Sequence, residues 1–130
     1  MSNRKPEGNR GTYAHLFAYR ISKGKHDTLL SVLQKLTKIY KKHGMIESRV
    51  YQLGPTRVFE GFEGFDKALD TPSGEEVWVE VDSYANEDEF HKVVANIGED
   101  QDAGPLWGEL AGATAGTKVL MGEFRLLTKE

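Results

Sequence analysis

Four segments in which apolar and polar residues alternate are separated by segments with helical spacing, and this order restricts the possible folds. Alternation with a period of two, typical of β-strands, occurs over 12–21, 45–53, 76–84 and 118–127. Apolar residues at helical spacing lie between the first and second of these segments, and again between the third and fourth. We therefore predict the element order β-α-β-β-α-β.

Both predicted helices have recognisable signals at their ends. Asp27 is a candidate N-cap of the first helix, and Gly44 is a candidate for the glycine that follows its last turn. Asn86 with Glu89 three residues later forms a variant of the capping box at the start of the second helix. The apolar stripes consist of Leu29, Leu33, Leu36 and Tyr40 in the first helix and of Phe90, Val93, Val94 and Ile97 in the second.

This element order is that of the split βαβ, ferredoxin-like α+β fold, in which a four-stranded antiparallel sheet carries both helices on one face. A chain of 130 residues with 38% hydrophobic content is long enough to bury one core. We predict a single domain over 12–130. Residues 1–11 are polar and lack an apolar segment, so we expect a disordered tail there and neither a signal peptide nor a membrane anchor.

Composition argues against several classes of partner and site. The net charge of -3 has mixed signs and no basic stripe, so no nucleic-acid partner is expected, and no apolar run is long enough to predict a membrane partner. Cysteine is absent, which excludes disulfides, thiolate nucleophiles and cysteine metal sites. The four histidines form no metal-binding motif, so no metal site is expected. Absence of cysteine favours a cytoplasmic location.

The two faces of the predicted sheet differ in chemistry. In the segment EVWVEVDSY, the three valines share one face, whereas Trp78, Glu80 and Asp82 share the other. We predict that the valine face packs under the helices, together with Ala14, Leu16, Ala18, Ile46, Val50, Leu120, Phe124 and Leu126. The face predicted to be uncovered contains Tyr13, His15, Phe17, Tyr19, Glu47, Arg49, Tyr51, Trp78, Glu80, Asp82, Met121, Glu123 and Arg125.

An uncovered aromatic face of this size is unusual on a monomer and typically marks an interaction surface. A second copy of the chain can cover it, because two such sheets can pack face to face across a twofold axis. We therefore predict a homodimer that forms through the Trp78 face of the sheet.

The segments YAHLFAYRISKGK, KKHGMIESRVY, GEEVWVEVDSY and MGEFRLL resemble the dimeric α+β barrel superfamily, and in particular a group of uncharacterised bacterial and archaeal proteins within it. The resemblance covers about residues 12–127 and implies a dimer. The superfamily includes cofactor-free oxygenases, isomerases, haem-handling enzymes and proteins without known activity. Its haem-degrading members use an asparagine with a tryptophan and a histidine, and no asparagine is present in the first strand here, so no cofactor is expected.

His15 is the main candidate for chemistry. In the ferredoxin-like strand order the first strand lies between the third and the fourth, which brings His15 near Asp82 or Glu80 on one side and near Glu123 or Arg125 on the other. A histidine beside a carboxylate can act as a general base, and the same residues can instead form a structural ion-pair network. Candidate ligand-binding residues on the same predicted face are Tyr13, Tyr19, Arg49, Tyr51 and Trp78.

Two functions remain open from the sequence. One is a small-molecule-binding homodimer that holds an apolar or aromatic ligand. The alternative is a cofactor-independent enzyme of the monooxygenase or isomerase type, in which His15 and a carboxylate transfer protons. The connection over 54–74, with its repeat FEGFEGF, is either an aromatic lid over a pocket or an excursion whose phenylalanines attach it to the body or to a partner.

Overall fold

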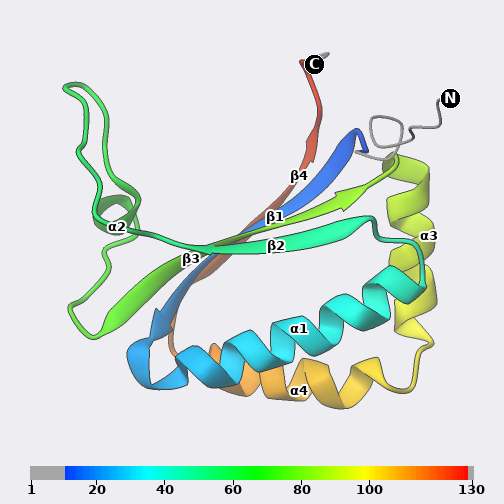
Figure 1. Cartoon of the computed structure of the whole chain (residues 1–130). Helices are drawn as coiled ribbons and strands as arrows, with labels where there is room; N and C mark the ends of the chain where they lie inside the picture. The colour runs from blue at the N-terminus through cyan, green and yellow to red at the C-terminus, as the bar shows by residue number, and fades with distance from the viewer. Residues whose placement is uncertain (1–10, 129–130) are drawn as a thin grey trace, which may run out of the picture.

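The four predicted strands form one antiparallel sheet in the order β2-β3-β1-β4 (Figure 1). The computed structural model describes residues 11–128, so the predicted tail lies almost entirely outside the described residues. The predicted element order and the α+β ferredoxin-like fold are confirmed. The elements are β1 (Tyr13–Ser22), the 3-10 turn η2 (Lys23–Lys25), α1 (His26–Lys42), β2 (Glu47–Gln52), α2 (Phe65–Ala68), β3 (Glu75–Tyr84), α3 (Glu87–Gly98), α4 (Ala103–Ala113) and β4 (Val119–Arg125).

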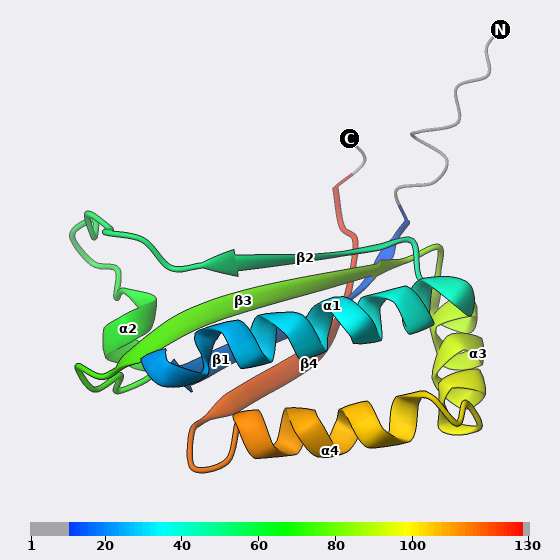
Figure 2. The same cartoon turned by 60° about the horizontal axis from the view of Figure 1, so that its bottom comes forward.

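The three longer helices lie on one side of the sheet, which leaves the other side without a helical layer (Figure 1). Helix α4 lies beside α1, and this pair extends the layer beyond the two helices of the basic fold (Figure 2). None of the described helices is long and apolar enough to cross a membrane. The connection between β2 and β3, which contains α2, projects beyond the end of the sheet (Figure 1).

The end signals of the helices were largely predicted correctly. The Asn86 side chain accepts a hydrogen bond of 2.8 Å from the backbone N–H of Glu89, as the capping motif requires. Gly44 follows α1 with a φ of +124°, a conformation that favours glycine. The prediction for Asp27 was wrong, because η2 starts the helix early and α1 begins at His26, so Asp27 lies inside the first turn.

Strand pairing brings His15 between two acidic residues. Its Cα partner on β3 is Asp82, and its partner on β4 is Glu123. Directly opposed residues in an antiparallel pair point to the same face, with Cβ atoms roughly 4.5–5.5 Å apart. The predicted neighbourhood of His15 is therefore confirmed.

The helices cover the aromatic and acidic face of the sheet, and our prediction that they cover the valines was wrong. Trp78, Glu80 and Asp82 are 2%, 7% and 6% exposed, respectively. On the opposite face, Leu120 and Phe124 are about half exposed, at 49% and 53%. We call this second surface the open face; it contains Ala14, Leu16, Ala18, Val79, Val81, Leu120 and Phe124.

The aromatic face fits under the helices because its large rings fill the core and its polar atoms find partners there. Trp78 and Tyr19 pack with Leu29 and Leu33 of α1 in one cluster. A second cluster joins aromatic side chains of β1 and β3 to α3 and contains Tyr13, Met45, Tyr84, Phe90, Val93, Ile97 and Ala103. The indole Nε1 of Trp78 donates to Glu76 Oε1 at 2.9 Å, so its burial leaves no unpaired donor.

The register of β2 also differs from the prediction. Val50 lies opposite Glu80, whereas Arg49 and Tyr51 lie opposite Val81 and Val79. Because side chains alternate along a strand, a register one residue away from the predicted one moves every side chain to the other face. Ile46 and Val50 were predicted under the helices beside the valines; Val50 lies under the helices, but beside Glu80. Glu47, Arg49 and Tyr51 were predicted on the uncovered face and lie on it, but beside the valines instead of Trp78.

Trp78→Ala should destabilise the domain by about 3–5 kcal/mol, because it opens a large cavity in a closely packed core. Trp107→Ala is the matched control: this indole is 41% exposed on α4, and we expect a loss of about 1 kcal/mol or less. Urea denaturation of both variants measures the difference. Equal losses would contradict the assignment of Trp78 to the covered face.

Candidate functional site

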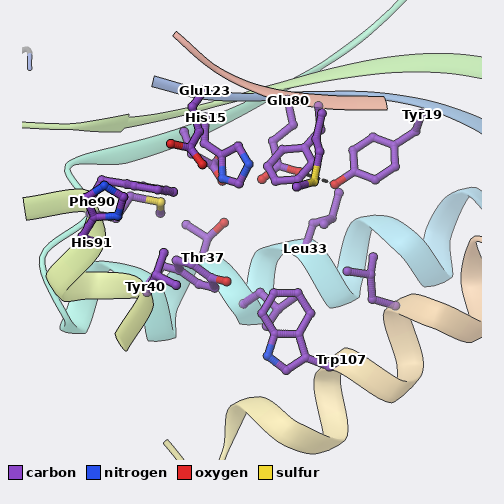
Figure 3. Close-up of a pocket in the computed structure, with 17 residues that line it drawn as sticks. His15, Tyr19, Leu33, Thr37, Tyr40, Glu80, Phe90, His91, Trp107 and Glu123 are labelled. Atoms are coloured by element: carbon purple, nitrogen blue, oxygen red, sulfur yellow. Dashed lines mark hydrogen bonds between the residues drawn. The ribbon is translucent and has the colours of Figure 1, made fainter. Parts of the chain in front are cut away.

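A cavity of about 490 Å³ lies between the sheet and the helix layer (Figure 3). Its floor is formed by side chains of β1, β3 and β4, and its roof by side chains of α1, α3 and α4. Most of the lining is apolar, and the polar groups collect on the sheet side. The residues of the floor are His15, Phe17, Tyr19, Glu80, Asp82, Met121 and Glu123.

The imidazole of His15 is held between two aromatic rings. Its centroid lies 4.4 Å from that of Phe17 and 5.2 Å from that of Phe90, and the contact with Phe90 is edge-to-face. Burial lowers the pKa of His15, and the negative charges of Asp82 and Glu123 partly oppose this effect. His15 is therefore neutral at pH 7, with acidic groups on both sides that can stabilise an added proton.

Glu80 and Asp82 form a buried acidic pair beside His15. Tyr19 donates a hydrogen bond of 2.7 Å to Glu80 Oε1, and this contact fixes the carboxyl group. Burial, with a further contribution from Asp82, raises the pKa of Glu80 to about 9, so Glu80 is protonated at pH 7. Burial likewise raises the pKa of Asp82.

Glu123 lies on the solvent side of His15. It is exposed, and one of its oxygens accepts a hydrogen bond from the hydroxyl of Tyr13. This bond is the main reason that the pKa of Tyr13 is raised to about 12. The imidazole thus lies between a buried acid on β3 and an acid on β4 that is in contact with water.

Two polar atoms of residues that line the cavity have no hydrogen-bond partner within 11–128. They are His15 Nε2 and Asp82 Oδ1, and both are buried. Buried polar atoms in native proteins are normally paired with protein, water or ligand. Both atoms are closed off from water in this structure, so their pairing requires a small local rearrangement.

The helices contribute the apolar part of the cavity, which sequence reasoning did not find. The indole of Trp107 lies edge-to-face against Tyr40, with centroids 6.1 Å apart, and both rings point into the cavity (Figure 3). Leu33, Leu36 and Leu110 add aliphatic surface. The helical stripes were recognised in the sequence, but they were assigned to the valine face, so their role in a pocket was missed.

The candidate residues divide into three groups in the structure. His15, Glu80, Asp82, Glu123 and Tyr19 line the cavity together. Tyr13, Trp78 and Arg125 lie on the same face of the sheet but do not line it, and Arg125 lies opposite Tyr13 at the end of β4. Arg49 and Tyr51 lie on the open face, on the other side of the sheet from the cavity.

Two further predictions concern the cavity. None of the residues 54–74 lines it, so the phenylalanines of this connection do not form a lid in this structure. Phe59 and Phe62 contact each other edge-to-face and are 70% and 72% exposed. Among the described residues, no group of three or more histidine, aspartate or glutamate side chains is arranged to hold a metal ion.

No family model and no curated protein matches this chain. Among solved structures, SnoaB, a cofactor-independent oxygenase from Streptomyces nogalater, is 12% identical with a TM-score of 0.52, over 92% of this chain and 97% of that one. A dimeric ferredoxin-like protein from an uncultured marine organism is 9% identical with a TM-score of 0.58, over 92% and 99%. A hydroxynitrile lyase from Passiflora edulis is 16% identical with a TM-score of 0.55, over 93% and 98%.

At these identities the similarity is one of fold. It covers almost the whole length of each protein, so the ferredoxin-like arrangement is shared from end to end. The ferredoxin-like fold that the resemblance implied is thereby confirmed. Two of the three similar structures are enzymes with different chemistry, which shows that one fold supports more than one reaction.

The raised pKa of Glu80 predicts how stability depends on pH. In the unfolded chain the carboxyl loses its proton near its ordinary pKa of 4.5, whereas in the folded protein it keeps the proton up to about pH 9. Unfolding between these values releases a proton, so the contribution of Glu80 is fully present below about pH 4.5 and is lost as the pH rises towards 9. The free energy of unfolding should therefore fall across this range.

Glu80→Gln should make this fall shallower, because glutamine does not titrate. Urea denaturation at several pH values between 5.5 and 8.5 measures the slope, and Glu109→Gln, at an exposed position of α4, is the control. The control should keep the slope of the unsubstituted protein. An unchanged slope in Glu80→Gln would show that this carboxyl is ionised at neutral pH.

Proposed function

We propose that the protein is an enzyme that binds a small, mainly apolar molecule in the cavity and removes a proton from it, with His15 as the general base. The observation that carries this proposal is the position of the His15 side chain, which lines a mainly apolar cavity between Asp82 and Glu123. A neutral imidazole is a competent base at pH 7, and the lowered pKa of His15 keeps it in this form.

The surrounding acids have distinct roles in this mechanism. When His15 takes a proton, the imidazolium lies between Asp82 and Glu123, whose negative charges favour it. Glu80 is neutral and bonded to Tyr19, so it holds its neighbour Asp82 in place without adding a further charge. Exposed Glu123 is placed to pass the proton from His15 to water.

Similar structures support an enzymatic function for a fold of this kind. They include a cofactor-independent oxygenase and a hydroxynitrile lyase. Removal of a proton from an O–H or C–H group can begin an oxidation, an isomerisation or an elimination. The cavity therefore fits the cofactor-independent, oxygenase- or isomerase-like function considered from the sequence.

A binding protein without turnover is the second candidate. It is favoured by the mainly apolar lining and by the protonated state of Glu80, which lowers the charge of the cavity. In that case His15 only hydrogen-bonds to the ligand and never accepts its proton. The two candidates therefore differ in the ionisation state of the bound molecule.

We further propose that the active form is a homodimer that forms through the open face. Leu120 and Phe124 are half exposed on this face, because no helix covers them. Leu16 and Val81 add aliphatic surface beside them. One protein of the same fold is described as dimeric. We therefore still propose a dimer, but with its interface on the open face of the sheet instead of the Trp78 face.

A coloured phenol tests the role of His15. 4-Nitrophenol absorbs visible light as the phenolate and much less as the phenol, so its colour reports transfer of its proton. Near neutral pH, where both forms of the free compound are present, the bound compound should show a phenolate band with the unsubstituted protein, because the imidazole can take up the proton. His15→Gln should weaken this band while equilibrium dialysis still detects binding, because the cavity keeps its apolar walls.

The control for this experiment is His91→Gln. His91 is exposed at the mouth of the cavity and interacts with Glu87, so its loss should leave the phenolate band in place. Binding of nitrophenol only as the neutral phenol would contradict the general-base proposal and would favour the binding protein. Equal loss of the band in both variants would also contradict it.

Leu120→Glu should convert the dimer to a monomer without unfolding it. The side chain is 49% exposed in the single chain, so a charge is tolerated there, whereas two buried charges in an apolar interface are costly. Sedimentation velocity measures the change, and Ala111→Glu on the exposed surface of α4 should leave the dimer intact. An unsubstituted protein that sediments as a monomer at micromolar concentration would refute this interface.

A further inference from the structure

Two tyrosines line the cavity, and the protein uses the hydroxyl of only one of them. Tyr19 donates its hydroxyl to Glu80 Oε1 at 2.7 Å. The hydroxyl of Tyr40 has no hydrogen-bond partner among residues 11–128, and it is not one of the polar atoms closed off from water. Figure 3 shows this hydroxyl directed from α1 towards the middle of the cavity, across from His15 and Glu80.

The ring of Tyr40 is held in place by packing. Trp107 of α4 lies edge-to-face against it, with centroids 6.1 Å apart. Tyr40 also packs against the core cluster that contains Met45 and Phe90. A side chain that is fixed in this way loses little further freedom when a ligand binds, so its hydroxyl is positioned in advance.

The hydroxyl of Tyr40 is a hydrogen-bond donor at physiological pH. Burial raises the pKa of Tyr40, and the carboxyl groups of Asp82 and Glu80 raise it further. Tyr40 therefore keeps its proton at pH 7 and can donate it in a hydrogen bond to an acceptor atom of a ligand. The influence of both carboxyl groups agrees with the position of Tyr40 across from the acidic floor.

Negative charge on a ligand would find few other partners in this cavity. Among the described residues that line it, none is a lysine or an arginine. His91 lies at the mouth and interacts with Glu87, and the indole N–H of Trp107 points away from the floor (Figure 3). A ligand should therefore enter as a neutral molecule, and charge that develops on it needs a neutral donor such as Tyr40.

The base and this donor come from opposite walls of the cavity, which separates the two events of a proton transfer. His15 on the floor takes the proton, and the hydroxyl on the roof can bind the atom that gains negative charge. In a phenol both events occur at one oxygen. In a ketone with a neighbouring C–H group, the C–H bond breaks, its electron pair forms the C=C bond of the enolate, and the carbonyl pair moves onto oxygen.

We propose that the cavity takes neutral aromatic ketones that can form an enolate, and that Tyr40 binds their carbonyl oxygen. His15 removes the proton from carbon, and the hydroxyl of Tyr40 donates to the enolate oxygen. The aromatic part of the ketone packs against Phe17 and Phe90. This inference rests on the proposed function, because it uses the same base and names the substrate class.

2-Tetralone and tetralin test the binding of the carbonyl group, because they share a ring skeleton and differ in the carbonyl oxygen. Tyr40→Phe removes only a hydroxyl. Equilibrium dialysis should show that it weakens binding of 2-tetralone roughly fivefold to tenfold and changes binding of tetralin by less than about twofold. Tyr51→Phe is the matched control, since it removes a hydroxyl on the open face, and it should affect neither ligand.

Exchange of the C1 protons of 2-tetralone with deuterated water tests the chemical step, because each exchange passes through the enolate. Proton NMR measures the rate. The unsubstituted protein should accelerate the exchange, and Tyr40→Phe should reduce the catalysed rate at saturating ketone roughly tenfold to hundredfold. His15→Gln should remove the catalysed exchange and keep the tighter binding of 2-tetralone relative to tetralin.

The outcomes separate this inference from the proposed function. Equal binding of 2-tetralone by Tyr40→Phe and by unsubstituted protein overturns the inference whatever the nitrophenol experiment shows, and binding of tetralin reports that the variant is folded. A loss that occurs in Thr37→Val instead also overturns it, since Thr37 carries the neighbouring hydroxyl of α1. Absence of catalysed exchange in the unsubstituted protein overturns the enolate chemistry. Exchange that survives in His15→Gln but depends on Tyr40 overturns the general base alone.

Discussion

Burial of an acidic and aromatic row under the helices is the constraint on which the rest of this structure depends. Trp78, Glu80 and Asp82 alternate along β3 with valines, so one choice of face decides the environment of all of them. Once the acids are covered, ionisation becomes unfavourable, and each carboxyl needs a proton or a hydrogen bond. Tyr19 meets this need for Glu80, and His15 lies opposite Asp82.

The same choice produces both the cavity and the open face. The helices pack on the aromatic face and leave the cavity over His15 and Phe17. The aliphatic row turns outwards, where Leu120 and Phe124 stay half exposed and suit a partner of the same kind. Core, site and proposed interface are therefore consequences of one orientation of β3.

Sequence patterns predicted the strand partners of His15 correctly, but they did not predict the helical residues that line the cavity around it. The strand order follows from the element order, and it brings Asp82 and Glu123 to the two sides of His15 whichever face is covered. Tyr40 and Trp107 were not recognised as cavity residues, because a helical stripe indicates burial without indicating which face of the sheet it meets. Arg49 and Tyr51 lie on the uncovered face, as predicted, but beside the valines instead of Trp78, since the turn after α1 sets the register of β2 and its length does not reveal that register.

The sequence by itself determined the elements, their order and the caps, because these depend on local periodicity and on short-range signals such as Asn86 and Gly44. It also determined that two chemically different faces exist on β3. Only the tertiary structure decided which face the helices cover, because the answer depends on whether buried acids find partners on neighbouring strands. Those partners, Tyr19 on β1 and Ser48 on β2, lie 61 and 32 residues from Glu80 along the chain, beyond the range of any local pattern.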